Sequence, residues 1–400
     1  MEQTWTMDRF QPQDAEGVVA LYREVYGENY PVRTVYDPQA LIRQEETGEA
    51  RRVVARAAAG EVIGHTAFYR TSPPFPGIYE YGQLMIRHDW RQTVVASELF
   101  VYGMEEIQKF QEIEQIWGEA VCNHLFTQQF TAWQHFIETG LEVGLMKGES
   151  YSKALREVST DKERVSALLV FRSLRSRPQT LFLPGVYEAA LRFIYETDHS
   201  GHEFFPAERP LPAGVDTRAT LQSFPGAGVA RFSFDELGRD FESRLAYLDS
   251  EASSAGAVVT QALLRLTDPC VGAAVDILRR RGYCFGGALP RWFDDDGLMM
   301  QKIRPPMDFD KIHVYTKRAR WIKEFIRQDL AAVRPMTVGG VLNKMAAMLP
   351  DGAAILHPLR KVRMTFAELD QAATEVAKAL MALGVDKNEH VAIWATNAPE

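Results

Sequence analysis

One stretch of the sequence, Gln83 to Phe110, constrains the fold more than any other. It opens with an apolar run that ends at Ile86, passes through the polar bend Arg87 to Arg91, and becomes helical from about Val94. Apolar or small residues then recur every three or four positions, which predicts one buried helical face: Ala96, Leu99, Gly103, Ile107 and Phe110. A strand that bends directly into a helix places backbone N–H groups at the helix N-terminus, where the helix dipole favours an anion. The stretch therefore predicts a strand–helix unit with an anion site, usually a phosphate site, at its junction.

This junction resembles the acyl-CoA pyrophosphate loop of the GNAT N-acetyltransferases. Leu84 to Ile86 match the strand of that motif, Arg91 matches its opening basic residue, and Ala96 matches its last small residue. Val94 stands where the family has its first glycine, and its methyl groups would narrow the approach of a pyrophosphate to the backbone. The resemblance implies that acetyl-CoA or another acyl-CoA would bind at Leu84, Met85, Ile86, Arg91, Thr93, Val94, Val95 and Ala96.

GNAT chemistry needs a base for the amine proton and an acid for the leaving thiolate. Some family members use a Glu on the fourth strand as the base, and Glu80 has that spacing before Ile86. The alternative for Glu80 is a solvated or salt-bridged strand carboxylate. The usual acid is a Tyr four residues before the Gly that ends the second helix, but Phe136 holds that place before Gly140 and has no proton to give. His135 would point about 100° away on the predicted helix, so the resemblance implies a candidate base and no acid.

Residues 1–177 carry the element order of a whole GNAT domain, β-α-β-β-β-α-β-α-β-β. Two of its strands, Val53 to Ala57 and Val62 to Phe68, form a predicted hairpin around Gly60. The second helix of the motif region is predicted from Phe126 through Ile137, with Gly140 as the residue that closes it. The sequence therefore predicts a GNAT-like domain with the candidate loop at the expected place.

Residues 178–305 repeat the second half of this order and are predicted to form a degenerate second GNAT-like domain. The segment 199–228, rich in Pro, Gly and charge, is predicted as a loop, and Gly282 is taken as the counterpart of Gly140. Only Gly238 stands where a second pyrophosphate loop would need more small residues. The acidic run Asp294 to Asp296 is interpreted as a turn, because Gly297 follows it, and no metal site is predicted.

The remaining residues change character twice. Residues 306–336 hold a basic amphipathic helix, predicted over Asp308 to Val333, which we expect to pack on its own protein. Residues 337–400 contain a capping box at Thr365 and Glu368 and a buried strand predicted at Val391 to Ala395. This segment resembles the opening of the AMP-binding acyl-CoA synthetases, which form acyl-adenylates. The fold class is thus mixed α/β: a tandem GNAT-like acyl-CoA N-acyltransferase fold, then the beginning of an adenylate-forming ligase domain.

Composition limits the functional classes. Four hundred residues with a net charge of −8 indicate a multidomain globular protein without bulk attraction to nucleic acid. No apolar run is long enough for a transmembrane segment, and three dispersed cysteines favour a reducing, cytoplasmic compartment.

Two functions of different class follow from the resemblances. In the first, the chain is the N-terminal part of an acyl-CoA synthetase fused to GNAT-like modules, with acyl-CoA or a carboxylic acid as substrate. ATP and Mg²⁺ would then bind only if the ligase continues past Glu400, and the ligase domain could dock on the GNAT-like region. In the second, the tandem is a catalytically idle module that senses acyl-CoA or docks a partner. An active N-acetyltransferase that uses acetyl-CoA is a further alternative.

Overall fold

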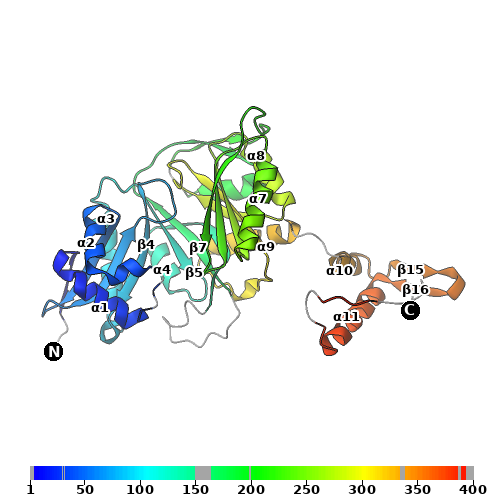
Figure 1. The fold of residues 1–400 in the computed structure, drawn as a ribbon, viewed down its shortest axis with the longest axis horizontal. Coiled ribbons are helices and arrows are strands. Elements are labelled where there is room, and N and C mark those ends of the chain that lie inside the picture. Colours follow the sequence, from blue (N-terminus) through cyan, green and yellow to red (C-terminus); the bar gives the residue numbers. More distant parts are fainter. Residues whose placement is uncertain are drawn as a thin grey trace. The chain divides into compact units, whose positions relative to one another are not determined.

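The computed structural model describes residues 4–28, 30, 32–148, 164–197, 200–333, 338–385 and 389–392. The chain divides into two compact units, Met1–Val333 and Arg334–Glu400 (Figure 1). In the part of the chain that the structure describes, no helix has the length and apolar character to cross a membrane.

The first unit is built on one twelve-stranded mixed sheet, in the order β1-β2-β3-β4-β5-β7-β6-β13-β14-β12-β11-β10. Its strands are β1 (Trp5–Arg9), β2 (Ala50–Ala57), β3 (Val62–Tyr69), β4 (Ile78–Ile86), β5 (Gln115–Val121), β6 (Ile137–Lys147), β7 (Arg164–Ser173), β10 (Arg218–Phe224), β11 (Val229–Glu236), β12 (Val259–Arg265), β13 (Cys284–Leu289) and β14 (Gly297–Ile303). A separate parallel pair joins β8 (Thr180–Leu183) and β9 (Glu203–Pro206). The predicted mixed α/β fold is confirmed.

Helices pack on this sheet in both halves (Figure 1). They are α1 (Ala15–Tyr26), α2 (Pro38–Glu46), α3 (Val95–Ile107), α4 (Phe126–Trp133), α6 (Glu188–Tyr195), α7 (Phe241–Ser254), α8 (Val271–Arg280) and α9 (Lys317–Val333). Met85 packs in a cluster with Tyr22 of α1, whereas the next residue, Ile86, packs in a cluster with Leu99 of α3. Because successive strand residues face opposite sides, α1 and α3 cover opposite faces of β4.

The sheet contains an internal repeat. The first repeat, β4-α3-β5-α4-β6-β7, is matched by the second repeat, β11-α7-β12-α8-β13-β14. In each, the first two strands are parallel, the second and fourth are antiparallel, and the third and fourth are antiparallel. This shared topology confirms the predicted tandem GNAT-like fold.

The two repeats meet edge to edge at β6 and β13, a contact that we call the joint. Its register pair is Gly140 with Gly287. A Cβ atom on Gly140 would lie 2.5 Å from the carbonyl oxygen of Gly286, so only glycine allows this approach. On the joint, α9 packs against both β6 and β13 through an apolar face that includes Ile322 and Ile326. The expectation that the basic amphipathic helix packs on its own protein is confirmed, although it begins at Lys317 and not at Asp308.

The prediction for the second helix was wrong. α4 ends at Trp133, where His135 takes a left-handed φ of 60° and the Phe136 N–H donates to Thr131 O at 3.0 Å. This is a Schellman ending, after which the chain enters β6. α8 ends in the same way at Gly282, with a φ of 86°. Therefore His135 corresponds to Gly282, and Gly140 corresponds to Gly287 and not to Gly282.

Other elements also differ from the prediction. α2 had not been predicted, and the segment 199–228 contains β9 and β10 in addition to loop. β10 is mostly exposed and forms the last strand of the sheet through its antiparallel pairing with β11. Since its side chains lack a clear apolar face, that pairing and not the sequence pattern makes it a strand. β13 covers Cys284–Leu289, whereas the sequence pattern predicts a strand from Ala288 to Phe293.

The second unit is small. It contains α10 (Val338–Met348), β15 (Ala353–His357), β16 (Val362–Thr365) and α11 (Phe366–Ala382), with β15 and β16 antiparallel. The predicted capping box is confirmed, because Thr365 Oγ1 accepts from the Glu368 N–H and the Glu368 side chain accepts from the Thr365 N–H. Residues 391–392 of the predicted strand have no regular structure, and the rest of that strand lies outside the described residues.

Candidate functional site

The first repeat opens between β4 and β5. Only Ile78 to Glu80 pair with β5, although β4 continues to Ile86 and β5 to Val121. Gln83 has a φ of 57°, and the register between β3 and β4 shifts beside it, which defines a β-bulge. Because a bulge bends its strand, β4 separates from β5 beyond Glu80.

The loop between β4 and α3 leaves backbone donors free. The N–H groups of Val94, Ala96 and Ser97 donate to no other described residue, and the Val95 N–H reaches Thr93 Oγ1 at 3.3 Å. Val94 has a φ of −79°, which valine adopts without strain, and it is 56% exposed. The backbone at this position therefore does not require a glycine. These donors at the first turn of α3 are suited to an anion.

The candidate cofactor residues divide into two groups. Met85, Ile86 and Val95 are buried in the core, so only their backbone could contact a ligand. Leu84 is half-buried, and so is Ala96. Arg91 donates from Nε to the Ile86 carbonyl at 3.2 Å, which holds its guanidinium beside the loop. The structure thus gathers Arg91, Thr93, Val94 and Ala96 at the start of α3.

Glu80 lies next to this opening. It is half-buried and accepts a hydrogen bond from the Tyr69 hydroxyl at 2.9 Å. Burial raises the pKa of its carboxyl, against hydrogen bonds from Tyr69 and Thr71. Nearby, the Tyr22 hydroxyl donates to Gln83 Oε1 at 2.6 Å, and burial together with the charge of Glu80 raises the pKa of Tyr30. A carboxylate that lies beside tyrosine side chains and has a raised pKa has the properties of a general base.

The expected acid position is closed. Phe136 is 5% exposed and packs in the main core, and His135 belongs to the helix ending described above. Two carboxyl groups that the sequence reasoning missed, Glu119 of β5 and Glu142 of β6, lie in the same region as Glu80. The available signal was the presence of acidic residues inside largely apolar strands, where a carboxyl group is costly unless it is paired or functional.

The equivalent loop of the second repeat is filled by its own chain. The Gly238 N–H donates to Thr217 Oγ1 at 3.0 Å, and the Arg239 N–H donates to the Val215 carbonyl at 3.0 Å. Asp240 accepts from the Thr217 N–H at 2.6 Å and adds a negative charge at the start of α7. A Cβ on Gly238 would lie 2.5 Å from backbone atoms of this covering segment. The second repeat therefore has no room for a pyrophosphate at this position.

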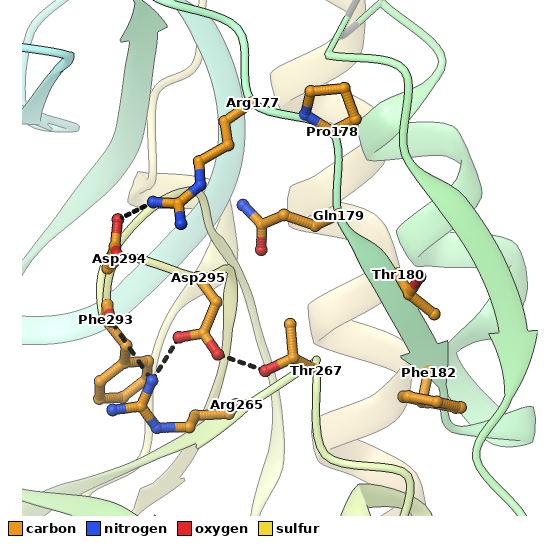
Figure 2. A pocket seen from close by; sticks show the side chains of 10 residues that line it. All are labelled: Arg177, Pro178, Gln179, Thr180, Phe182, Arg265, Thr267, Phe293, Asp294 and Asp295. Atoms are coloured by element: carbon orange, nitrogen blue, oxygen red, sulfur yellow. Dashed lines mark hydrogen bonds and ion pairs between the residues drawn. The ribbon is translucent and has the colours of Figure 1, made fainter.

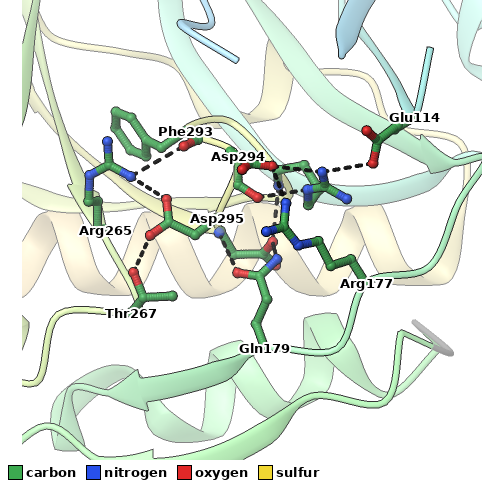
Figure 3. A network of polar contacts seen from close by, with 10 residues as sticks. Glu114, Arg177, Gln179, Arg265, Thr267, Phe293, Asp294 and Asp295 are labelled. Atoms are coloured by element: carbon green, nitrogen blue, oxygen red, sulfur yellow. Dashed lines mark hydrogen bonds and ion pairs between the residues drawn. The ribbon is translucent and has the colours of Figure 1, made fainter. Parts of the chain in front are cut away.

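A separate cavity of about 650 Å³ lies in the second repeat, beside the acidic turn (Figure 2). Its lining consists of Arg177, Pro178, Gln179, Thr180, Phe182, Arg265, Thr267, Phe293, Asp294 and Asp295. The charged groups satisfy one another: Asp294 pairs with Arg177, and Asp295 pairs with Arg265 and Thr267 (Figure 3). Among the described residues, no group of three or more His, Cys, Asp or Glu side chains could hold a metal ion. Since its charges are paired internally, this cavity is a weaker candidate than the opening at β4.

The fold and the site together define the first unit: two GNAT-like repeats share one sheet, with an open strand–helix junction in the first repeat and a filled one in the second. Solved structures similar to the chain include an acetyltransferase of the GNAT family from Desulfovibrio desulfuricans, at 13% identity. The matched region covers 43% of this chain and 99% of the chain of that solved structure, with a TM-score of 0.32. An N-acetyltransferase from Staphylococcus aureus Mu50 is 12% identical, with coverages of 43% and 99% and a TM-score of 0.34. The assignment of the fold rests on strand order and pairing.

The C-terminal segment has its own relatives. Residues 342–400 match the family model of the AMP-binding enzymes. A Bacillus subtilis (strain 168) protein named as an acyl-CoA synthetase, YngI, is 42% identical over 64 residues, which are 16% of this chain. The matched segment spans 12% of the length of that relative. The resemblance of this segment to acyl-CoA synthetases is confirmed.

Proposed function

We propose that this chain combines a GNAT-like acyl-CoA unit with the start of an acyl-CoA synthetase, and that the first repeat transfers an acyl group from acyl-CoA to an amine. One observation carries the proposal: β4 separates from β5 at a bulge and leads to an α3 N-terminus with free N–H groups. An opening of this kind can admit an extended chain with a terminal anion.

The residues present fit the pyrophosphate of an acyl-CoA. The N–H groups of Val94, Ala96 and Ser97 would donate to it, and Arg91 would add a positive charge. When bound, acyl-CoA supplies a thioester that an amine can attack. Glu80 would take the proton from the amine, since its raised pKa makes it a stronger base than an exposed carboxylate.

The ligase part is proposed from the C-terminal match. An AMP-forming ligase would activate a carboxylic acid with ATP and Mg²⁺ and pass it to CoA, so it would make the compound that the first repeat consumes. This relation between product and substrate gives a reason for joining the two units in one chain.

Calorimetry with CoA and acetyl-CoA tests the cofactor site. Val94→Glu places a carboxylate beside the free N–H groups and should weaken binding at least about tenfold through charge repulsion. Val186→Glu is the matched control, because Val186 is also exposed, at 47%, but lies outside the first repeat, in the turn between β8 and α6. The proposal fails if the parent protein does not bind CoA at millimolar concentration, or if both variants bind equally.

Acyl transfer to amines tests the base. Glu80→Gln should lower the rate of amine acylation by about 100-fold or more and leave the affinity for CoA unchanged. The second candidate function, an idle acyl-CoA sensor, is favoured by Phe136 at the usual acid position. It predicts CoA binding by the parent protein without acylation of any amine.

A further inference from the structure

The strand register places Arg231 of the second repeat where Glu80 stands in the first. Glu80 pairs with Trp117 across β4 and β5, and Arg231 pairs with Gln261 across β11 and β12. Two residues beyond Trp117 on β5, Glu119 pairs with Leu169, which pairs with Gly140 at the joint. Two residues beyond Gln261 on β12, Leu263 pairs with Met299, which pairs with Gly287 at the joint. One repeat thus carries a carboxylate at a position where the other carries a guanidinium.

Arg231 reaches across the sheet into the first repeat. Its Nη2 donates to Glu142 Oε1 at 3.2 Å, and its Nε donates to Gln261 Oε1 at 2.8 Å. Gln261 Nε2 also donates to Glu142 Oε1, at 2.6 Å. In the sheet, β6 and β11 are separated by β13, β14 and β12, so these contacts cross the concave face between the repeats. Trp117 and Trp292 also meet there, with ring centroids 5.0 Å apart.

The other oxygen of Glu142 has no donor. Glu142 is 1% exposed, and its Oε2 is buried without a hydrogen-bond partner among the described residues unless a neighbouring carboxyl carries a proton. The carboxyl of Glu119 is that neighbour: it lies on the same face of the sheet, close enough that a proton on it would be donated to Glu142. Two carboxyl groups can share a hydrogen bond only when one is protonated. Burial raises the pKa of both carboxyl groups, but Arg231 and Gln261 oppose this effect at Glu142, so we assign the shared proton to Glu119.

The surrounding charges favour the same distribution. Burial raises the pKa of Glu119, and the charges of Glu142 on β6 and Glu80 on β4 raise it further, against the opposing effect of Arg231 on β11. Glu119 is half-buried, in contrast to Glu142, so a ligand in the gap between β4 and β5 can reach it. It lies two residues beyond Trp117, where β4 and β5 have already separated.

We propose that Glu119 is the proton donor to the leaving thiolate, and that Glu142 and Arg231 are positioning residues that keep it in this role. The inference rests on the acyl transfer proposed above. It supplies the acid that Phe136 cannot supply, and it makes the second repeat a part of the catalytic site of the first.

The proton transfers balance. The amine nitrogen attacks the thioester carbonyl carbon, the C–N bond forms, and Glu80 takes one proton from nitrogen. When the C–S bond breaks, the sulfur keeps the electron pair and takes the proton of Glu119, which gives an amide and a free thiol. Glu80 then carries one proton more and Glu119 one less, and transfer of a proton from Glu80 to Glu119, directly or through water, restores both groups.

The first test measures acyl transfer from acetyl-CoA by the full chain as a function of pH. Glu119→Gln should lower kcat by about 100-fold at neutral pH without changing the affinity for CoA. Glu142→Gln removes the anion that holds the proton on Glu119, so the alkaline limb of the pH profile should move to lower pH. Glu138→Gln is the matched control, since Glu138 is also buried on β6 but accepts from Thr316 Oγ1 of the segment before α9. It should leave the profile unchanged.

The second test does not depend on turnover. Burial also raises the pKa of Glu45 to about 7, so the infrared test at pH 7 compares spectra of the parent protein and its variants. The difference between the parent protein and Glu119→Gln should contain the carbonyl stretch of a protonated carboxylic acid, and the difference between the parent protein and Glu138→Gln should not. Absence of this band from the first difference spectrum overturns the inference. Acyl transfer by the parent protein with an unimpaired Glu119→Gln variant also overturns it and leaves the proposed function standing, whereas a parent protein that binds CoA but acylates no amine refutes both.

Discussion

Gly140→Ala should separate the two repeats at the joint. A Cβ at this position would lie 2.5 Å from Gly286 O and 2.7 Å from Gly287 Cα. Both are backbone atoms and cannot rotate away, so β6 and β13 must move apart by about 0.5 Å before even the closest tolerated contact is reached. Overpacking of a rigid site costs up to about 3 kcal/mol, and we expect that loss in the free energy of unfolding.

Urea unfolding of the full chain, followed by tryptophan fluorescence, measures this loss, because Trp117 and Trp292 pack against each other across the repeats. Gly118→Ala is the matched control. Gly118 also lies inside a buried strand, but the nearest atoms to its Cβ would be 3.5 Å and 3.7 Å away, which is ordinary contact. We expect that variant to stay within about 1 kcal/mol of the parent protein. Equal unfolding midpoints for the two variants would refute the reasoning about the joint.

Three further predictions concern single residues. Burial lowers the pKa of His65 to about 3, so its NMR signals should not titrate between about pH 8 and pH 4. Because the unfolded chain takes up that proton, His65 should lower the stability as the pH falls below about 6.5; a midpoint near 6.5 in the native spectrum would contradict this. His135 holds a left-handed φ of 60° where Gly282 stands in the second repeat, and His135→Gly should raise the free energy of unfolding by up to about 1 kcal/mol in urea titrations; a clear decrease would count against it. Thr365→Ala removes the oxygen that caps α11 through the Glu368 N–H and should cost about 1 kcal/mol, seen as a lower calorimetric transition temperature of the second unit, whereas Thr365→Ser should have little effect.

Local patterns were sufficient to predict many elements of the first repeat. β4 ends at Ile86, where the sequence predicts the end of the apolar run, and the hairpin of β2 and β3 forms around Gly60 as expected. The capping box of α11 was also predicted correctly. Each of these depends on residues a few positions apart, whose spacing is visible in the sequence. Errors arose where two local signals competed, as at the end of α4, where the apolar spacing continued through Ile137 although the chain had already left the helix.

The candidate site was only partly accessible from sequence. The motif led to Arg91 and to the loop around Val94, and the family resemblance led to Glu80. The conformation of Val94, which decides whether its side chain obstructs the loop, could not be read from its identity. The same holds for Gln83, whose left-handed backbone forms the bulge that separates β4 from β5.

The sequence by itself determined the strand–helix junction, the repeated order of elements and the capped helix near the C-terminus, because these depend on periodicity and on neighbours along the chain. Tertiary structure alone decided which residues meet across the sheet. Glu142 and Arg231 are 89 positions apart and come from strands that are not adjacent. Their contact depends on the joint at Gly140 and Gly287 and on the curvature of the sheet around it. Such a contact has no local pattern, since register and curvature arise from the packing of the whole sheet.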